Sequence, residues 1–193
     1  MKNSIIISLL LSGLVKSQVV LGGDAGTAAD KTSVLLDFAA SQNKGIVVPY
    51  VETLPADNSA QSKPGTIIFD VSGNTEYKVK VKNTNNTSPS WTDLSGQSGY
   101  SSAVENIVKT AQASLTDVSS AKVIIGANAS AADGILILES SNKAMVLPIV
   151  SDYTAIKNPA PGMIAFLKPG TDPSRYRLII FNGQKWSFWA PSS

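Results

Sequence analysis

The chain has 193 residues without cysteine or histidine, and 43% of its residues are hydrophobic while 16% are charged. That hydrophobic share can fill the core of one ordinary domain or two small ones. The missing residue types exclude disulfides, serine–histidine and cysteine–histidine catalysis, and zinc or iron–sulfur sites built from their usual ligands. We therefore expect no enzymatic activity and no cofactor.

Residues 1–17 have the layout of a secretory signal peptide. Lys2 supplies a positive charge, residues 5–15 form an apolar run, and Ser17 offers a small residue before a cleavage site at Gln18. The run is shorter than the roughly 20 residues that span a bilayer, and the alternative is a buried first helix or strand. We expect a mature protein in the periplasm, on the cell surface or outside the cell, without membrane insertion.

The charge of the chain changes when the signal is removed. The precursor carries +2, but Lys2 and Lys16 belong to the signal, so the mature chain has 14 basic and 14 acidic residues. A neutral protein has no overall field to attract nucleic acid. We expect no nucleic-acid partner.

An internal repeat is the most informative pattern in the sequence. Three matches keep nearly the same spacing: residues 43–49 with 142–148 at 99 residues, 64–69 with 161–166 at 97, and Trp91 with Trp186 at 95. Upstream, residues 34–37 resemble 135–138. We infer two tandem copies of a small β-sheet module, at residues 18–95 and 122–193, joined by a linker over residues 96–121.

Each copy consists of short apolar runs bounded by turn residues, which indicates a mainly β fold. Pro49 and Pro148 lack an amide hydrogen and should end a strand or lie on an edge. In the first copy Lys78, Lys80 and Lys82 alternate with valines, so they share one strand face. We expect a solvated face that discourages edge-to-edge pairing, with a basic binding stripe as the alternative.

The linker contains one short helix candidate, over residues 103–117. Its apolar residues recur at helical spacing, and Ser102 with Glu105 has the form of a capping box. The alternative is an extended linker.

The segment Asn182-Gly183 predicts a two-residue hairpin turn in the second copy. This turn would pair Arg177 with Phe188 on one face and Tyr176 with Trp189 on the other.

Trp186 should face the core of its own module, because Trp91 recurs at its place in the first copy. The surplus aromatic residues are either covered by the rest of the chain or available to a partner. The candidate partner-binding residues are Tyr176, Arg177, Phe188 and Trp189.

Two patterns resemble catalytic sites but favour structural roles. Asp37, Asp70, Asp133 and Asp152 lie near predicted strand ends, and no spacing selects a catalytic pair among them. Ser-x-x-Lys, a spacing found in penicillin-interacting serine enzymes, begins at Ser41 and Ser140, where it precedes an apolar strand and predicts a turn.

Three segments carry a resemblance: Asn-Lys-Gly-Ile-Val-Val-Pro at 43–49, Asn-Pro-Ala-Pro-Gly-Met-Ile at 158–164 and Phe-Asn-Gly-Gln-Lys-Trp at 181–186. This frame resembles secreted Bacteroidota surface and tail-fibre-like β-modules, over most of residues 18–191. Tyr50 and Ile149 stand where those modules commonly have arginine. The resemblance implies export and a β-rich surface module, and it brings no catalytic residue.

These observations favour a non-catalytic structural or interaction protein of the cell envelope or surface, serving as an accessory subunit of a larger assembly. Its partner would be another protein or a second copy. The runner-up is a carbohydrate-binding module that uses exposed aromatic rings to bind a glycan.

Overall fold

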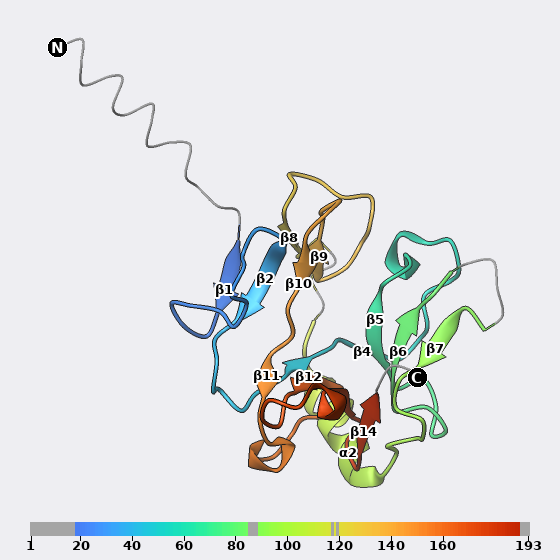
Figure 1. Cartoon of the computed structure of the whole chain (residues 1–193). Helices are drawn as coiled ribbons and strands as arrows, with labels where there is room; N and C mark the ends of the chain where they lie inside the picture. The colour runs from blue at the N-terminus through green and yellow to red at the C-terminus, as the bar shows by residue number, and fades with distance from the viewer. Residues whose placement is uncertain (1–17, 85–88, 117, 119, 190–193) are drawn as a thin grey trace, which may run out of the picture.

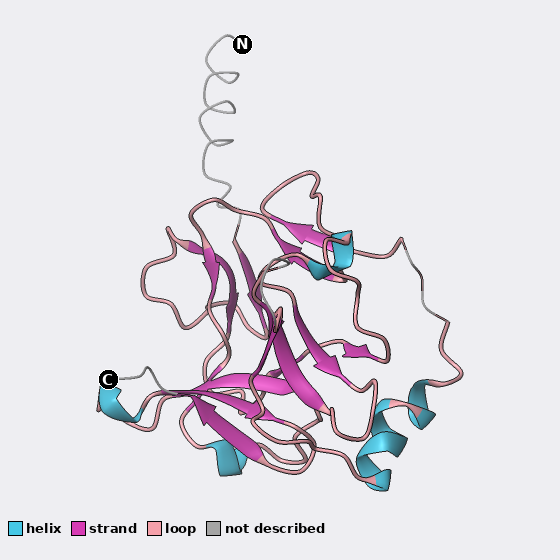
Figure 2. Cartoon of the chain, turned by 90° about the vertical axis from the view of Figure 1, so that its right-hand side faces the viewer, coloured by secondary structure: helices cyan, strands magenta, loops and turns pink. Residues whose placement is uncertain are grey.

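The computed structural model describes residues 18–84, 89–116, 118 and 120–189, so the predicted signal peptide lies outside the described residues. The fold is mainly β, as the sequence predicts (Figure 1). The helical segments are short and lie at the periphery of the strands (Figure 2).

The described residues of the first half, 18–84 and 89–101, lie before the helix and form seven strands and one 3-10 turn. They are β1 (Val19–Leu21), β2 (Val34–Phe38), β3 (Ile46–Val47), β4 (Tyr50–Val51), η2 (Ala60–Ser62), β5 (Ile67–Asp70), β6 (Lys78–Lys82) and β7 (Trp91–Asp93).

The part of the second half that the structure describes, after the helix and up to residue 189, again forms seven strands, with two 3-10 turns. They are β8 (Val123–Ile125), β9 (Leu136–Leu138), β10 (Ala144–Met145), β11 (Ile149–Val150), η4 (Tyr153–Ala155), β12 (Met163–Leu167), η5 (Pro173–Arg175), β13 (Arg177–Phe181) and β14 (Trp186–Trp189).

The halves contain sheets with the same strand order. The first half has the sheet β4-β5-β6-β7 and the second the path β11-β12-β13-β14, each with one parallel pair followed by two antiparallel pairs. Pro49 and Pro148 lie just before β4 and β11, outside the strands as expected. Their carbonyl oxygens accept hydrogen bonds from the amides of Phe69 and Phe166 at 2.8 and 2.9 Å.

Two further pairings join the halves. Strand β3 adds to β12 of the second half, and β10 adds to β2 of the first half. Figure 1 shows β1, β2, β8, β9 and β10 gathered at one end of the molecule, although they come from both halves.

The core has two parts, on opposite faces of β12 and β13. One face carries Ile164 and Ile180, which pack with Phe69 and Val79 of the first half. The other face carries Ile179, which packs with residues of the second half alone. Both faces of these central strands are therefore covered.

The helix is shorter than residues 103–117. It consists of α2 (Ser102–Val108) and the 3-10 turn η3 (Thr110–Gln112). Threonine and serine residues follow Val108, and their side chains compete for backbone hydrogen bonds, which weakens helix propensity.

The predicted capping box of Ser102 and Glu105 does not cap the helix. Ser101, not Ser102, is the N-cap, and its Oγ accepts a hydrogen bond from the Val104 amide at 3.2 Å. Val104 and Val108 are buried, while the expected apolar residue Leu115 is exposed. Only part of the predicted apolar face of the helix is therefore buried in the core.

Candidate functional site

The C-terminal hairpin of β13 and β14 has a different register from the predicted one. Trp189 lies opposite Leu178, not Tyr176. Phe188 lies opposite Ile179, not Arg177. The predicted pairs are therefore wrong by two positions. Because an even shift leaves side chains on the same faces, each residue keeps its predicted face.

The cause of the shift is the buried side chain of Asn182. Its Oδ1 accepts hydrogen bonds from the amides of Gln184 and Lys185 at 3.0 and 2.8 Å. The Asn182 amide donates to the Lys185 carbonyl, so the loop between these two residues is Gly183-Gln184. The sequence pattern Asn-Gly indicates the turn but not which residues flank it.

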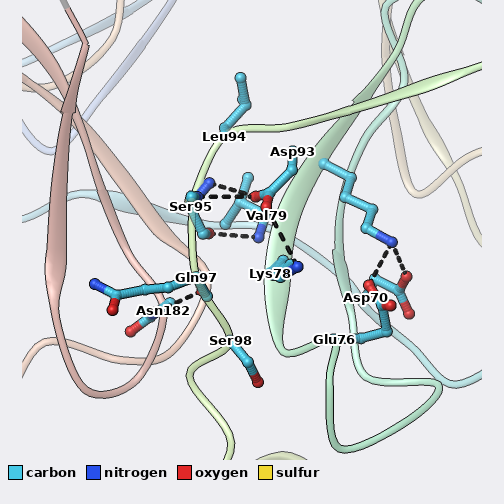
Figure 3. A network of polar contacts seen from close by, with 12 residues as sticks. Asp70, Glu76, Lys78, Val79, Asp93, Leu94, Ser95, Gln97, Ser98 and Asn182 are labelled. Carbon is cyan, nitrogen blue, oxygen red and sulfur yellow. Dashed lines mark hydrogen bonds and ion pairs between the residues drawn. The ribbon is translucent and has the colours of Figure 1, made fainter. Parts of the chain in front are cut away.

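Asn182 also attaches the hairpin to the first half of the chain. Its Nδ2 donates to the Gln97 carbonyl at 3.0 Å, in the segment that follows β7 (Figure 3). The same segment is ordered by Ser95, whose Oγ accepts from the Val79 amide at 2.9 Å and whose own amide donates to Asp93. The hairpin is thus held against a segment that is itself braced.

Two aromatic side chains remain substantially exposed at the end of β14. Phe188 is 47% exposed and Trp189 is 41% exposed. Trp189 Nε1 donates to the Leu94 carbonyl at 2.6 Å, and the Phe188 ring packs edge-on against Tyr153 at 5.1 Å. Each ring therefore has a fixed orientation while much of its surface faces solvent.

Trp186 faces the core formed by the second half, which confirms the prediction for this residue. It packs against the cluster that contains Ile179. Its ring contacts those of Phe181 and Tyr153, with centroids 5.2 and 6.0 Å away.

Tyr176 and Arg177, the other two predicted partner residues, make contacts with their own surroundings. The Arg177 guanidinium donates to the carbonyls of Ser174 and Tyr176 at 2.7 and 2.8 Å, so it braces its own loop. The Tyr176 ring packs against Phe166 at 6.1 Å, with the Lys168 ammonium 5.5 Å from its centroid.

The strand register reveals an apolar row that sequence reasoning missed. Ile149 lies opposite Phe166, Phe166 opposite Leu178, and Leu178 opposite Trp189, so these four residues cross four strands on the face that also carries Ile164 and Ile180. Leu178 packs against the core cluster of that face, and the row continues outward from it to Trp189 and Ile149. We call Ile149, Phe166, Leu178 and Trp189 the apolar row. No local motif marks such a row, because it depends on which strands pair.

The apolar row ends in a hollow at the Ile149 side. The hollow has a volume of about 320 Å³ and is lined by apolar side chains alone: Met145, Val146, Leu147, Ile149 and Phe166. Trp189 at one end of the row and the hollow at the other therefore belong to one face of the sheet.

The lysines of β6 are neither a solvated face nor a basic stripe, so both interpretations are wrong. Lys82 is fully buried, with its ammonium 5.3 Å from the centroid of the Trp91 ring. Each lysine has an acidic partner: Lys78 with Asp93 at 3.4 Å (Figure 3), Lys80 with Asp70 and Glu76 at 2.6 Å, and Lys82 with Asp57. Carboxylates of β5, β7 and the loops that hold Asp57 and Glu76 neutralise the face.

Two of the four carboxylates considered for catalysis are buried and ionised. Burial alone raises the pKa of Asp37, but hydrogen bonds from Lys31, the amides of Ala28 and Phe38, and Thr27 outweigh it and lower the pKa to about 2. Burial likewise raises the pKa of Asp70, and its hydrogen bonds, chiefly from Lys80, lower it below the usual range.

The other two carboxylates have local structural partners. Asp152 caps η4 by accepting from the Thr154 amide at 2.8 Å, and Asp133 accepts from Gln61 at 2.7 Å. Ser140 of the Ser-x-x-Lys pattern accepts from the Lys143 amide at 3.1 Å, which is the turn that the sequence predicts.

Within residues 18–84, 89–116, 118 and 120–189, no three acidic, histidine or cysteine side chains gather where they could hold a metal ion. No helix of these same ranges has the length and apolar character needed to cross a membrane. Comparison with known proteins finds no matching family model, curated protein or solved structure.

Proposed function

We propose that this chain is a non-catalytic, exported interaction protein of the cell envelope or surface, which binds a protein partner at the edge strand β14, through the apolar row on one face of the sheet and Phe188 on the other. The observation that carries the proposal is the pair of exposed, oriented rings at the end of the edge strand β14, with Trp189 on the face of the apolar row and Phe188 on the opposite face. Rigid aromatic side chains are favoured anchors of protein interfaces, because binding fixes few additional rotatable bonds. Export rests on the signal-peptide layout of residues 1–17.

The hollow favours a protein partner over a glycan. A sugar site needs polar groups that bind hydroxyls beside the aromatic ring. The hollow presents only aliphatic side chains, a methionine and Phe166, which suit apolar side chains of a protein. Glycan binding is the second candidate function, and the experiment described below distinguishes it from protein binding.

We also propose that the two halves arose by duplication of one β-sheet module. The repeated sequence segments support this, as do the equal strand order and the equivalent hydrogen bonds after Pro49 and Pro148. In each half a tryptophan begins the last strand, Trp91 opposite Lys82 and Trp186 opposite Phe181. The halves interlock through β3 and β10, so duplication does not imply separate folding.

The test of function is site-directed photocrosslinking of the mature chain in envelopes of its host, followed by binding of the captured partner in purified form. Trp189→Ala and Phe188→Ala should each weaken the dissociation constant about 30-fold, equivalent to about 2 kcal/mol. Leu115→Ala, at a 71% exposed position in the linker, is the matched control and should leave binding unchanged.

Three results would contradict this proposal. Retention on a glycan array that the same variants abolish would establish the sugar binder. Equal affinity of all variants would exclude the aromatic surface. A large fall in melting temperature of Trp189→Ala, with binding of the folded fraction unchanged, would show that the ring serves packing.

A further inference from the structure

Each half begins with a pair of parallel strands, β1–β2 in the first and β8–β9 in the second. The two pairs have equivalent registers, because Val19 lies opposite Leu36 and Val123 lies opposite Leu136. Leu36 and Leu136 therefore occupy the same position. The sequence match that aligns residues 34–37 with 135–138 is displaced from this register by one residue.

The two pairs differ in what covers their second strand. In the first half β10 adds to the outer edge of β2, where the Val146 amide donates to the Leu36 carbonyl at 2.9 Å, and Leu36 is 0% exposed. In the part of the chain that the structure describes, no strand adds to the outer edge of β9. Ile135 and Leu136 are 64% and 46% exposed there.

An isolated pair of this kind is unfavourable in water. Parallel strands are normally covered on both faces, and a two-stranded sheet is marginally stable alone. Residues 134–138 are Gly-Ile-Leu-Ile-Leu, without a charge or proline to discourage pairing. An open apolar edge without such protection favours the addition of another strand.

The backbone of β9 is suitably oriented for this addition. Ile135 accepts a hydrogen bond from the Val123 amide, and the Glu139 amide donates to the Ile125 carbonyl, both at 2.9 Å. Because alternate residues of a strand bond to opposite neighbours, the peptide groups of Leu136 point to the open edge. The equivalent carbonyl of β2 is the one that binds β10.

We propose that the outer edge of β9 pairs with β9 of a second copy of this chain, antiparallel about Ile137, to give a four-stranded sheet β8-β9-β9-β8. This arrangement is two-fold symmetric and closed, so it forms a dimer instead of an open filament. Leu136 then lies opposite Leu138 of the partner subunit. Glu139 lies opposite Ile135 of the partner subunit, which avoids a like-charge contact.

This surface is separate from the apolar row, so the two proposals fail independently. The dimer is tested by light scattering during gel filtration of residues 18–193, over about a hundredfold range of concentration. We expect twice the monomer mass for the unmodified chain and the monomer mass for Leu136→Lys. Leu21→Lys is the matched control, since Leu21 is also 46% exposed in a strand of the same type of pair, and it should stay dimeric. Trp189→Ala should stay dimeric as well.

A cysteine variant tests the pairing itself. The chain has no cysteine, and the pairing brings position 137 of both copies within reach of a disulfide. Ile137→Cys should form a covalent dimer under mild oxidation, whereas Leu21→Cys should not. A monomer at every concentration, or a dimer that survives Leu136→Lys, would overturn the proposal. A dimer lost in Leu136→Lys without the Ile137→Cys crosslink would overturn the antiparallel arrangement.

Discussion

Asp37 lies in β2 with no exposed surface, and it is stabilised as an anion by hydrogen bonds from Lys31, Thr27 and neighbouring amides. Its pKa is about 2, below the ordinary value of 3.8. Folding therefore favours the ionised form, and the resulting stability is complete above pH 4 and is lost as the pH falls through 2. The difference is equivalent to about 2 kcal/mol of unfolding free energy.

The Asp37→Asn variant tests this contribution. Its unfolding free energy at pH 7 should be lower by at least about 2 kcal/mol, because the Lys31 ammonium also loses its partner. Chemical denaturation between pH 2 and pH 5 should show a shallower pH dependence than that of the unmodified protein. An equal slope in both proteins would contradict the assignment of this pH dependence to Asp37.

Lys82 offers a second test at the residue scale, because its ammonium is buried while its partner Asp57 is largely exposed. Lys82→Met keeps the volume and removes the charge, so we expect stability within about 1 kcal/mol of the original. Asp57→Ala leaves a buried ammonium without its acidic partner and should be the more destabilising change. Urea denaturation of both variants shows which of them is less stable. If Lys82→Met is the less stable variant, the Lys82 charge itself stabilises the fold.

At the scale of the elements, the N-cap residue of α2 differs between the structure and the sequence pattern. Ser101 Oγ accepts from the Val104 amide, whereas the capping-box pattern points to Ser102. Ser101→Ala should therefore cost about 1 kcal/mol of unfolding free energy, and Ser102→Ala, at an exposed position, should cost close to none. Thermal denaturation of the two variants compares neighbouring serines directly, and a larger loss in Ser102→Ala would favour the capping box.

Local signals predicted the strands and their faces, but not the partners of the strands. Alternation along β13 and β14 gives the correct faces, and Trp186 contacts the core as expected. The register depends on which backbone groups the Asn182 side chain binds, which the Asn-Gly pattern does not determine. A turn displaced by one residue along the chain then shifts every cross-strand pair by two positions.

The features that the sequence did not reveal all depend on contacts between distant segments. The alternation of lysines and valines in β6 is visible in the sequence, but Asp57, which neutralises Lys82, lies 25 residues earlier. The apolar row likewise joins Ile149 to Trp189 through four strands. Such features follow from the pairing of distant segments, which a single sequence does not show.

At the scale of the whole molecule, the two halves share one part of the core. Phe69 and Val79 of the first half, Val104 of α2 and Ile180 of the second half belong to one buried cluster. Strands β3 and β10 each pair with a sheet of the opposite half. Removing either half would therefore expose apolar surface and leave unpaired strand edges on the other.

The halves should consequently unfold together, even if they arose from one duplicated module. Tryptophan fluorescence can follow each half, because Trp91 lies in the first and Trp186 and Trp189 in the second. Trp91→Phe reports on the second half, and the double variant Trp186→Phe, Trp189→Phe reports on the first. If the shared cluster couples the halves, the fluorescence midpoint in urea should match the circular dichroism midpoint within each variant. Two separated transitions would mean that residues 18–95 and 122–193 are autonomous modules, and that the contacts through β3, β10 and Ile180 contribute little to either.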